Sequence, residues 1–538
     1  MSGMGNIDRR EFVALAAVAG VRLSPLAPRT AELFEPQGSR TDLSERSVAE
    51  LSARMQKGEF TSRELTQYYL TRIATLDKKG PAVNAVIELN ADALQIADAL
   101  DGERKAGKVR GPLHGIPILI KDNIDTADKM RTTAGSLALA KSTPAKDAFI
   151  VERLRAAGAV LIGKTNLSEW ANYRSTRSSS GWSGRGGQTK NPFVLDRNPC
   201  GSSSGTGAGI SADFATIGIG TETDGSIICP SGICGLVGIK PTVGLWSRAG
   251  IIPISASQDT AGPMTRSVAD AAVLLGALTG TDARDAATRD SVGKSHPDYT
   301  RFLDANGLKG ARIGVARNLA GFNPGVDKLL DDAVAALKAA GAVIVDPANL
   351  TTANKFGDAE TIVLDYEFKA GLNAYFASLG ANAPVNSLTQ LIAWNEREKA
   401  TEMPFFGQEI LIRADKSGPL SDQKYRAART KCLRLARTDG IDATMTRFRL
   451  DAIVSPSNQP SWTTDHLNGD HFSGGDTSFA AVAGYPSITV PMGLVRELPV
   501  GLSFTGRAWT EGELIKIAYA FEQATKARRS PRFLPSIG

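Results

Sequence analysis

The sequence is poor in the residues that several classes of protein depend on. Four cysteines in 538 residues are too few for a fold held together by a disulfide framework. With only four histidines, a zinc site or a cluster of catalytic imidazoles would need residues from distant parts of the chain. No run of about 18 apolar residues occurs, which excludes a polytopic membrane protein. We therefore expect no metal, no cofactor and no stable membrane insertion.

Charge of one sign is also scarce. The 62 Lys and Arg residues against 56 Asp and Glu residues give a net charge of +6, with no basic stripe that could follow a phosphate backbone. A nucleic-acid partner is therefore not expected. The 42% hydrophobic and 22% charged residues are typical of a globular chain, and they exclude an intrinsically disordered one.

The amino end has the pattern of an export signal. Arg9 and Arg10 precede a short apolar stretch that ends near Val21. A paired arginine before such a stretch is typical of a twin-arginine signal, so residues 1–35 are interpreted as this signal and a spacer. This interpretation predicts a periplasmic or secreted protein. The alternative is a short amphipathic helix on a cytoplasmic protein, which the closeness of Arg22 to the apolar stretch supports.

Helical and strand-like patterns alternate along the chain. Residues 111–126 indicate a turn, a buried strand and a polar loop, residues 146–157 a helix, and residues 159–163 a strand. Such alternation is typical of an α/β sheet. We predict one large α/β/α domain, with a mixed central sheet covered by helices and with a helical insertion.

This domain is expected to span residues 40–535. Its core is expected at about residues 110–275, and the helical excursion, more charged than the core, at about 285–445. Within the excursion, strands are predicted near residues 311–315 and 342–345. No internal repeat and no clear linker divides the chain further.

Residues 174–209 are rich in serine and glycine. Composition alone would indicate a flexible linker. However, Trp182 and Phe193 interrupt the low complexity, and apolar elements flank the segment on both sides. We interpret it as a long functional loop inside the domain.

Two serines are candidate nucleophiles. Ser203 lies in Gly-Ser-Ser-Ser-Gly, which fits the G-x-S-x-G pattern of a nucleophile elbow, but no strand precedes it and the downstream His466 and His471 lie in a Gly/Asp-rich loop. Ser226 ends a polar turn after a strand-like segment, with Gly225 before it. Backbone N–H groups in such a turn can form an anion-binding nest that suits an oxyanion hole. The alternative for Ser226 is an exposed serine in an ordinary turn.

Because histidine is scarce, the base is expected to be a lysine. Lys121 directly follows an apolar run, where burial would favour its neutral form. The alternative is a strand-end lysine paired with Asp122 or Asp125. The S-x-x-K pattern at Ser421–Lys424 lies in a charged helical stretch and is interpreted as incidental.

Several longer motifs resemble the amidase signature family. They are Lys121 with its apolar run, Cys-Gly-Ser-Ser-Ser-Gly at residues 200–205, Asp-Gly-Ser at 224–226 and Gly-Ile-Lys-Pro-Thr at 238–242. Within the family the sequence is most similar to the bacterial peptide-amidase branch, which removes the C-terminal amide of peptides. At positions 200 and 224 the commoner family pattern has glycine. This sequence has Cys200 and Asp224 there, which resembles the peptide-amidase branch.

The resemblance implies a Ser-Ser-Lys triad and an oxyanion hole. It assigns the base to Lys121, the bridging residue in a cis peptide to Ser202, and the acyl-forming nucleophile to Ser226. The oxyanion hole is assigned to backbone N–H groups of Thr223, Asp224, Gly225 and Ser226. Apart from these assignments, Cys200, Cys229 and Cys234 are expected to be small packing residues.

The expected activity is hydrolysis of carboxylic amides to carboxylate and ammonia, with peptide C-terminal amides as substrates. The alternatives are a broad amidase of small amides, the glutamine-amidase subunit of a tRNA amidotransferase, and a non-catalytic pseudo-amidase that binds a partner. The export-like N-terminus argues against the tRNA amidotransferase, and the presence of all three triad residues argues against the pseudo-enzyme. The sequence does not indicate an oligomeric state.

Overall fold

The computed structural model describes residues 42–380 and 383–537. The predicted export signal, residues 1–35, lies outside the described residues. In the described part of the chain, no helix combines the length and apolar character needed to cross a bilayer.

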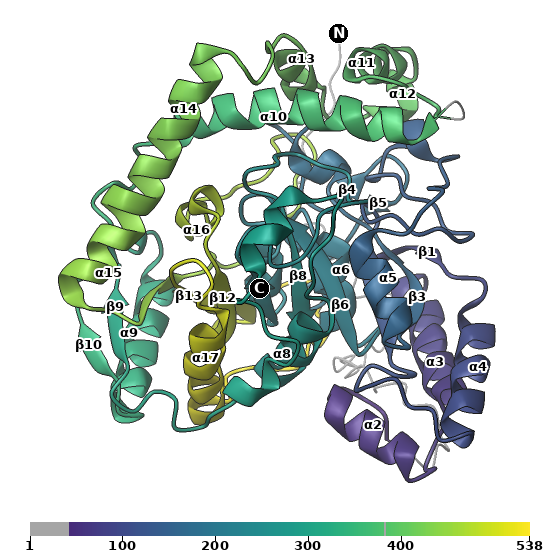
Figure 1. Cartoon of the computed structure of the whole chain (residues 1–538), viewed down its shortest axis with the longest axis horizontal. Coiled ribbons are helices and arrows are strands. Elements are labelled where there is room, and N and C mark those ends of the chain that lie inside the picture. Colours follow the sequence, from purple (N-terminus) through teal and green to yellow (C-terminus); the bar gives the residue numbers. More distant parts are fainter. Residues whose placement is uncertain (1–41, 381–382, 538) are drawn as a thin grey trace, which may run out of the picture. The chain divides into compact units, whose positions relative to one another are not determined.

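A mixed sheet of eleven strands runs through the centre of the domain, in the order β1-β3-β2-β6-β8-β7-β12-β13-β11-β9-β10 (Figure 1). Strand β2 pairs in parallel with β3 and β6, strand β9 pairs in parallel with β10 and β11, and the remaining neighbours are antiparallel. This sheet confirms the predicted fold class. The strands, including the separate β4–β5 pair, are β1 (Val86–Leu89), β2 (Pro117–Lys121), β3 (Val160–Thr165), β4 (Trp182–Ser183), β5 (Gly187–Gln188), β6 (Ile217–Glu222), β7 (Val237–Lys240), β8 (Thr260–Thr265), β9 (Arg312–Val315), β10 (Val343–Val345), β11 (Ala452–Pro456), β12 (Ser487–Val495) and β13 (Leu498–Thr505).

Helices pack on the sheet along its length. Helix α3 contacts β2 and β3, α4 contacts β3, α6 contacts β2, β6 and β8, and α7, α9 and α17 contact β12 and β13. The α-helices are α2 (Val48–Gln56), α3 (Ser62–Arg72), α4 (Ala93–Lys105), α5 (Phe149–Ala156), α6 (Ser204–Ser211), α7 (Ile228–Ile233), α8 (Val268–Ala277), α9 (Pro324–Ala339), α10 (Gly357–Ser378), α11 (Leu388–Arg397), α12 (Lys399–Glu402), α13 (Glu409–Asp415), α14 (Gln423–Leu433), α15 (Ala443–Phe448), α16 (Ser478–Ala483) and α17 (Glu511–Thr525).

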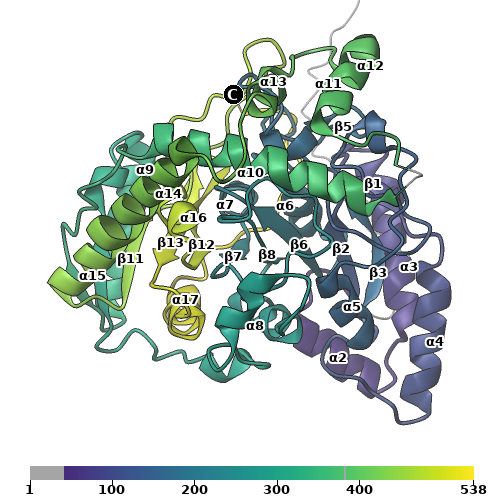
Figure 2. The same ribbon diagram turned by 45° about the horizontal axis from the view of Figure 1, so that its top comes forward.

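Strand β6 and helix α6 approach each other closely because small residues line their contact. Gly218 of β6 faces α6, where an added Cβ would lie 2.7 Å from a methyl group of Thr206. Gly220 has room for no side chain either, since a Cβ there would lie 2.8 Å from the hydroxyl of Ser203. This close packing places the residues that precede α6 beside the end of β6 (Figure 2).

The helical excursion lies beside the sheet and also extends it. Helix α10 packs against α13 and α14, and these helices follow one another along the margin of the domain in Figure 1. Strands β9 and β10 occupy the end of the sheet next to β11, which confirms the two strands predicted in this region.

The segment at residues 174–209 is an integral part of the domain. Its only regular strands are the short pair β4 and β5, yet most of its residues are buried. Backbone hydrogen bonds fix it to the rest of the chain, from Arg185 N–H to Gly135 and from Lys190 N–H to Val83, each at 2.8 Å. It is therefore a packed loop, as predicted, and not a linker.

Candidate active site

Lys121 is the last residue of β2 and is fully buried. Its Nζ lies 2.7 Å from Ser202 Oγ, 2.9 Å from Thr221 Oγ1 and 3.2 Å from the Thr221 carbonyl oxygen. Burial lowers the pKa of Lys121 to about 7, while the carboxylates of Glu222 and Asp259 act in the opposite direction. A substantial fraction of this amine is therefore uncharged at neutral pH, with a lone pair available to accept a proton.

Ser202 lies just before α6 in a tightly packed segment. The peptide bond between Gly201 and Ser202 is cis. The Ser202 carbonyl accepts a hydrogen bond from Ser168 N–H at 3.1 Å, and the Ser202 side chain is fully buried. A Cβ on Gly201 would lie 2.2 Å from Ser168 Oγ, so only glycine fits before Ser202. The hydroxyl of Ser202 is thus held against Lys121.

Ser226 ends the turn between β6 and α7. Gly225 before it has a φ of +78°, in the left-handed region that glycine adopts readily. The Ser226 carbonyl accepts the Ser203 N–H at 3.2 Å, which joins the turn to the segment of Ser202. On the other side of the turn, Glu222 Oε2 accepts the N–H groups of Ile227 at 2.7 Å and Ile228 at 2.9 Å. The backbone of Ser226 is therefore held against Ser203, the residue after Ser202, and Ser226 is 7% exposed.

Side chains in this turn are anchored away from its backbone. Thr223 Oγ1 donates to Asp259 at 2.6 Å, and the Asp224 carboxylate accepts hydrogen bonds from Thr477 at 2.5 Å and Ser478 at 2.6 Å. The N–H groups of residues 224–226 have no acceptor in the described part of the chain. Such N–H groups can bind an oxyanion.

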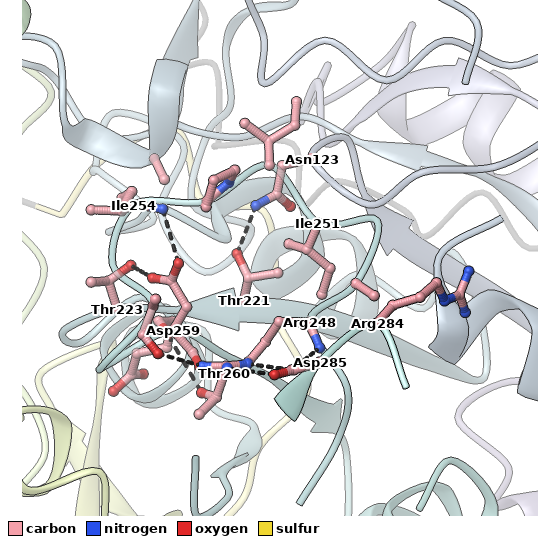
Figure 3. A pocket seen from close by; sticks show the side chains of 16 residues that line it. Asn123, Thr221, Thr223, Arg248, Ile251, Ile254, Asp259, Thr260, Arg284 and Asp285 are labelled. Carbon is pink, nitrogen blue, oxygen red and sulfur yellow. Dashed lines mark hydrogen bonds and ion pairs between the residues drawn. The ribbon is translucent and has the colours of Figure 1, made fainter. Parts of the chain in front are cut away.

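A cavity of about 200 Å³ adjoins the site (Figure 3). Its wall includes Asn123, Thr221, Thr223 and Asp259, and the apolar segment 251–254 lines another side. Burial raises the pKa of Asp259 to about 6. Because Thr221 lines the cavity and also contacts Lys121, the cavity reaches the immediate surroundings of the lysine.

The structure brings together the segments that carry the three residues assigned to the triad, whose catalytic roles stay a prediction. Lys121 contacts Ser202, and the Ser226 turn adjoins them through Ser203. Lys121 has no ion pair with Asp122, which instead lies 3.2 Å from Arg185. The hydroxyl of Ser203 is used in two hydrogen bonds with the backbone of Thr221, at 3.0 and 3.2 Å, which leaves it structural.

The other weaker candidates are apart from this cluster. Ser421 and Lys424 are exposed at the start of α14. His466 stacks on Phe405 with ring centroids 4.2 Å apart, and His471 is exposed.

One expectation about the cysteines was wrong. Cys200 and Cys229 form a disulfide with an S–S distance of 2.08 Å. They are 29 residues apart in sequence. The number of cysteines in a chain does not indicate which of them come together in the fold, so this pair could not be predicted from composition. Cys234 is a buried free cysteine, in keeping with a packing role.

Thr221, which contacts Lys121, and Asn123, which contacts Thr221, were not predicted as site residues from the sequence. Asn123 Nδ2 donates to Thr221 Oγ1 at 3.0 Å, next to the lysine contact. The sequence signal for these residues is their position at the ends of two strands. Strands β2 and β6 are parallel neighbours, with Ile120 opposite Ile219. Polar residues that follow two neighbouring parallel strands meet at the same edge of the sheet.

The comparisons with known proteins agree with this geometry. Residues 64–515 match the amidase family. The structure of native peptide amidase from Stenotrophomonas maltophilia is 53% identical, with a TM-score of 0.88, over 91% of this chain and 99% of that chain. A probable amidase of Arabidopsis thaliana is 40% identical over 92% of this chain and 93% of its own length. A glutamyl-tRNA(Gln) amidotransferase subunit of Caldanaerobacter subterraneus is 34% identical over 90% of this chain and 98% of its own length. The chain therefore belongs to the amidase signature family.

Proposed function

We propose that this protein hydrolyses carboxylic amides to a carboxylate and ammonia through an acyl-enzyme on Ser226. The observation that carries the proposal is the contact of 2.7 Å between Lys121 Nζ and Ser202 Oγ at a fully buried position. Burial brings the pKa of Lys121 to about 7, close to the pH at which a general base works best. A neutral lysine can activate a serine where no histidine is present.

In the acylation step, Lys121 accepts the proton of Ser202, and Ser202 accepts the proton of Ser226. Ser226 Oγ bonds to the amide carbon, and the electron pair of the carbonyl bond moves to oxygen. The N–H groups of residues 224–226 donate hydrogen bonds to this oxyanion. When the intermediate collapses, the C–N bond breaks, and Ser202 gives a proton to the leaving nitrogen and regains one from Lys121. The nitrogen leaves as ammonia.

Deacylation uses the same groups with water in place of Ser226. Water gives a proton to Ser202, which passes its own to Lys121, and the water oxygen bonds to the acyl carbon. The ester bond to Ser226 then breaks, its oxygen regains a proton through Ser202, and the carboxylic acid leaves. The amine of Lys121 is neutral again at the end of the cycle.

The proposed substrates are peptides with a C-terminal amide. The support is the 53% identity to peptide amidase over almost its whole length, compared with 34% to the amidotransferase subunit. A peptide amidase that is 53% identical was also solved with the competitive inhibitor chymostatin. A broad amidase of amino-acid, aliphatic or aryl amides is the second candidate, because the chemistry of the triad acts on the amide group itself.

The test is a panel of peptide amides, amino-acid amides, aliphatic amides and glutamine, with ammonia as the readout. We expect the highest kcat/KM for peptide amides and competition by chymostatin. Equal rates over the panel would favour the broad amidase, and glutamine as the best substrate would favour the amidotransferase subunit.

The nucleophile is tested by trapping the acyl-enzyme. We expect mass spectrometry to find the acyl group on Ser226, no adduct in Ser226→Ala, and normal labelling at Ser226 in Ser203→Ala. An adduct on Ser203 or on a cysteine would contradict the proposal.

A further inference from the structure

The disulfide lies between the two segments that carry the serines. Cys200 precedes Ser202 by two residues, and Cys229 follows Ser226 by three. The Cα atoms of the two cysteines are 6.1 Å apart, so the bridge joins the segment before α6 directly to the first turn of α7. Both half-cystines are buried, at 5% and 3% exposure.

Each half-cystine is also tied to the residues next to its serine. Cys229 N–H donates to the Gly225 carbonyl at 2.8 Å, directly before Ser226. The Cys200 carbonyl accepts the hydroxyl of Ser204 at 2.6 Å, which closes the backbone around Ser202. Movement of either sulfur would therefore be passed to the adjacent serine.

Cys200 has a backbone conformation that needs an external constraint. Its φ is +57°, in the left-handed region that residues with a Cβ seldom occupy. Such conformations persist where the surrounding structure enforces them, and they concentrate at functional sites. The covalent bond to Cys229 is one such constraint, and the hydrogen bond from Cys200 N–H to Asn198 Oδ1 at 2.8 Å is another.

A hydrogen bond also joins the two segments, on the other side of Ser202 from the disulfide. There, Ser203 N–H donates to the Ser226 carbonyl at 3.2 Å. The two segments are thus joined on both sides of Ser202, once by a hydrogen bond and once by a covalent bond. Transfer of a proton between two hydroxyls requires a fixed separation, and a displacement of about 1 Å can cost about a hundredfold in rate.

We propose that the Cys200–Cys229 disulfide positions Ser202 against Ser226 for catalysis, so that the enzyme is fully active only when the bridge is oxidised. This inference rests on the proposed roles of the two serines. Reduction breaks the S–S bond: a dithiol reductant supplies two electrons and two protons, both sulfurs become thiols, and the reductant becomes a cyclic disulfide. The activity would then depend on an oxidising compartment, such as the periplasm, to which the export signal predicted at residues 1–35 would direct the protein.

The first experiment compares Cys200→Ala/Cys229→Ala with Cys234→Ala/Cys432→Ala, which removes the two buried free cysteines instead. For a peptide amide, we expect kcat of the first variant to fall about tenfold to a hundredfold with KM within about twofold of the wild type. The acid limb of its pH profile should keep the wild-type pKa, because the burial of Lys121 is unchanged. The control variant should keep the wild-type kcat.

Labelling of Ser226 by a serine-directed sulfonyl fluoride separates this inference from the proposed function. If the wild type is not labelled at Ser226, the proposed function itself fails. If the wild type is labelled and Cys200→Ala/Cys229→Ala is labelled equally fast, or has the wild-type kcat, the positioning role is wrong. A variant that does not fold, as judged by circular dichroism, would show that the bridge serves stability and would also overturn it.

The second experiment uses the wild-type protein. Unfolding without reductant should expose two titratable thiols, and unfolding after dithiothreitol treatment should expose four. We expect kcat to fall in proportion to the thiols gained and to return on reoxidation, whereas kcat of Cys200→Ala/Cys229→Ala should not respond. Four thiols with unchanged kcat, or four thiols before any reduction in an active enzyme, would overturn the proposal.

Discussion

The ends of two neighbouring strands carry buried lysines with different surroundings. Lys121 ends β2 and Lys164 lies near the end of β3, and both are fully buried. Register pairs Ile120 with Lys164 and Lys121 with Thr165, so the two lysines are one step apart along parallel strands. Depth alone therefore does not distinguish them.

The two lysines differ in the side chains that surround them. Lys121 contacts a serine, a threonine and a carbonyl oxygen, and burial lowers its pKa to about 7. Lys164 Nζ donates to the Ile124 carbonyl at 2.6 Å and to Thr132 Oγ1 at 3.0 Å. Burial lowers the pKa of Lys164 too, but four carboxylates oppose the shift, those of Asp122, Asp125, Asp128 and Glu88. Lys164 therefore has four carboxylates that favour its charged form, whereas Lys121 has two, those of Glu222 and Asp259, and its amine lies against hydroxyl groups.

The largest expected effect comes from Lys121→Met, which keeps an unbranched side chain one atom shorter and removes the amine. Without the base, kcat for a peptide amide should fall by about 10⁴-fold, the upper range for loss of general base catalysis. Steady-state ammonia release measures the loss. If Lys121→Met keeps one tenth of the wild-type kcat, the amine of Lys121 is not the base.

The matched change at the other lysine should act on stability. Lys164→Met leaves the buried Ile124 carbonyl and Thr132 hydroxyl without their donor, so the free energy of unfolding should fall by about 1–3 kcal/mol. Urea unfolding measures this value. Any Lys164→Met protein that remains folded should retain most of the wild-type kcat. If its kcat falls as much as that of Lys121→Met, the two lysines do not differ in function as we expect.

Activity should depend on pH through Lys121. Its pKa of about 7 lies below the usual value, so protonation sets in as the pH falls through 7 and removes the base. The rate kcat/KM should therefore fall about tenfold for each pH unit below about 6. A pH profile that stays flat down to pH 4 would contradict a lysine base.

Stability should also depend on pH, by a smaller amount. In the unfolded chain Lys121 titrates near 10.5, and in the folded chain near 7, so between these values the unfolded state binds more protons. The free energy of unfolding should rise with pH in this window, by up to about 1.4 kcal/mol per pH unit from this group. Urea unfolding at pH 7.5 and 9 should show this increment in the wild type and not in Lys121→Met. An equal slope in both proteins would contradict the depressed pKa of Lys121.

The fold was predictable where the pattern is local. Apolar runs identified β2 and β3. Ser47 and Thr61 begin α2 and α3 through capping boxes, a signal that spans only four residues of sequence. Burial of the serine- and glycine-rich loop was predicted from Trp182 and Phe193, which are 5% exposed. Signals of this kind lie within a few residues of the element they define.

The site was predictable only in part, because contacts between distant segments leave little trace in one sequence. Lys121 was found from its apolar run, but its contact with Thr221 follows from the pairing of β2 with β6. Arg174 is fully buried and forms an ion pair with Glu169, which a composition rich in serine and glycine does not reveal.

The parallel pairing of β2 with β6 has a consequence for how activity is acquired. The residues proposed as base, relay and nucleophile are at chain positions 121, 202 and 226, and their segments come together only once these two strands have paired across the intervening chain. Contacts between such remote positions are among the slowest to form in folding. A newly synthesised or partly denatured chain would therefore not hydrolyse amides, even if its helices had formed. Amidase activity is thus a measure of complete folding.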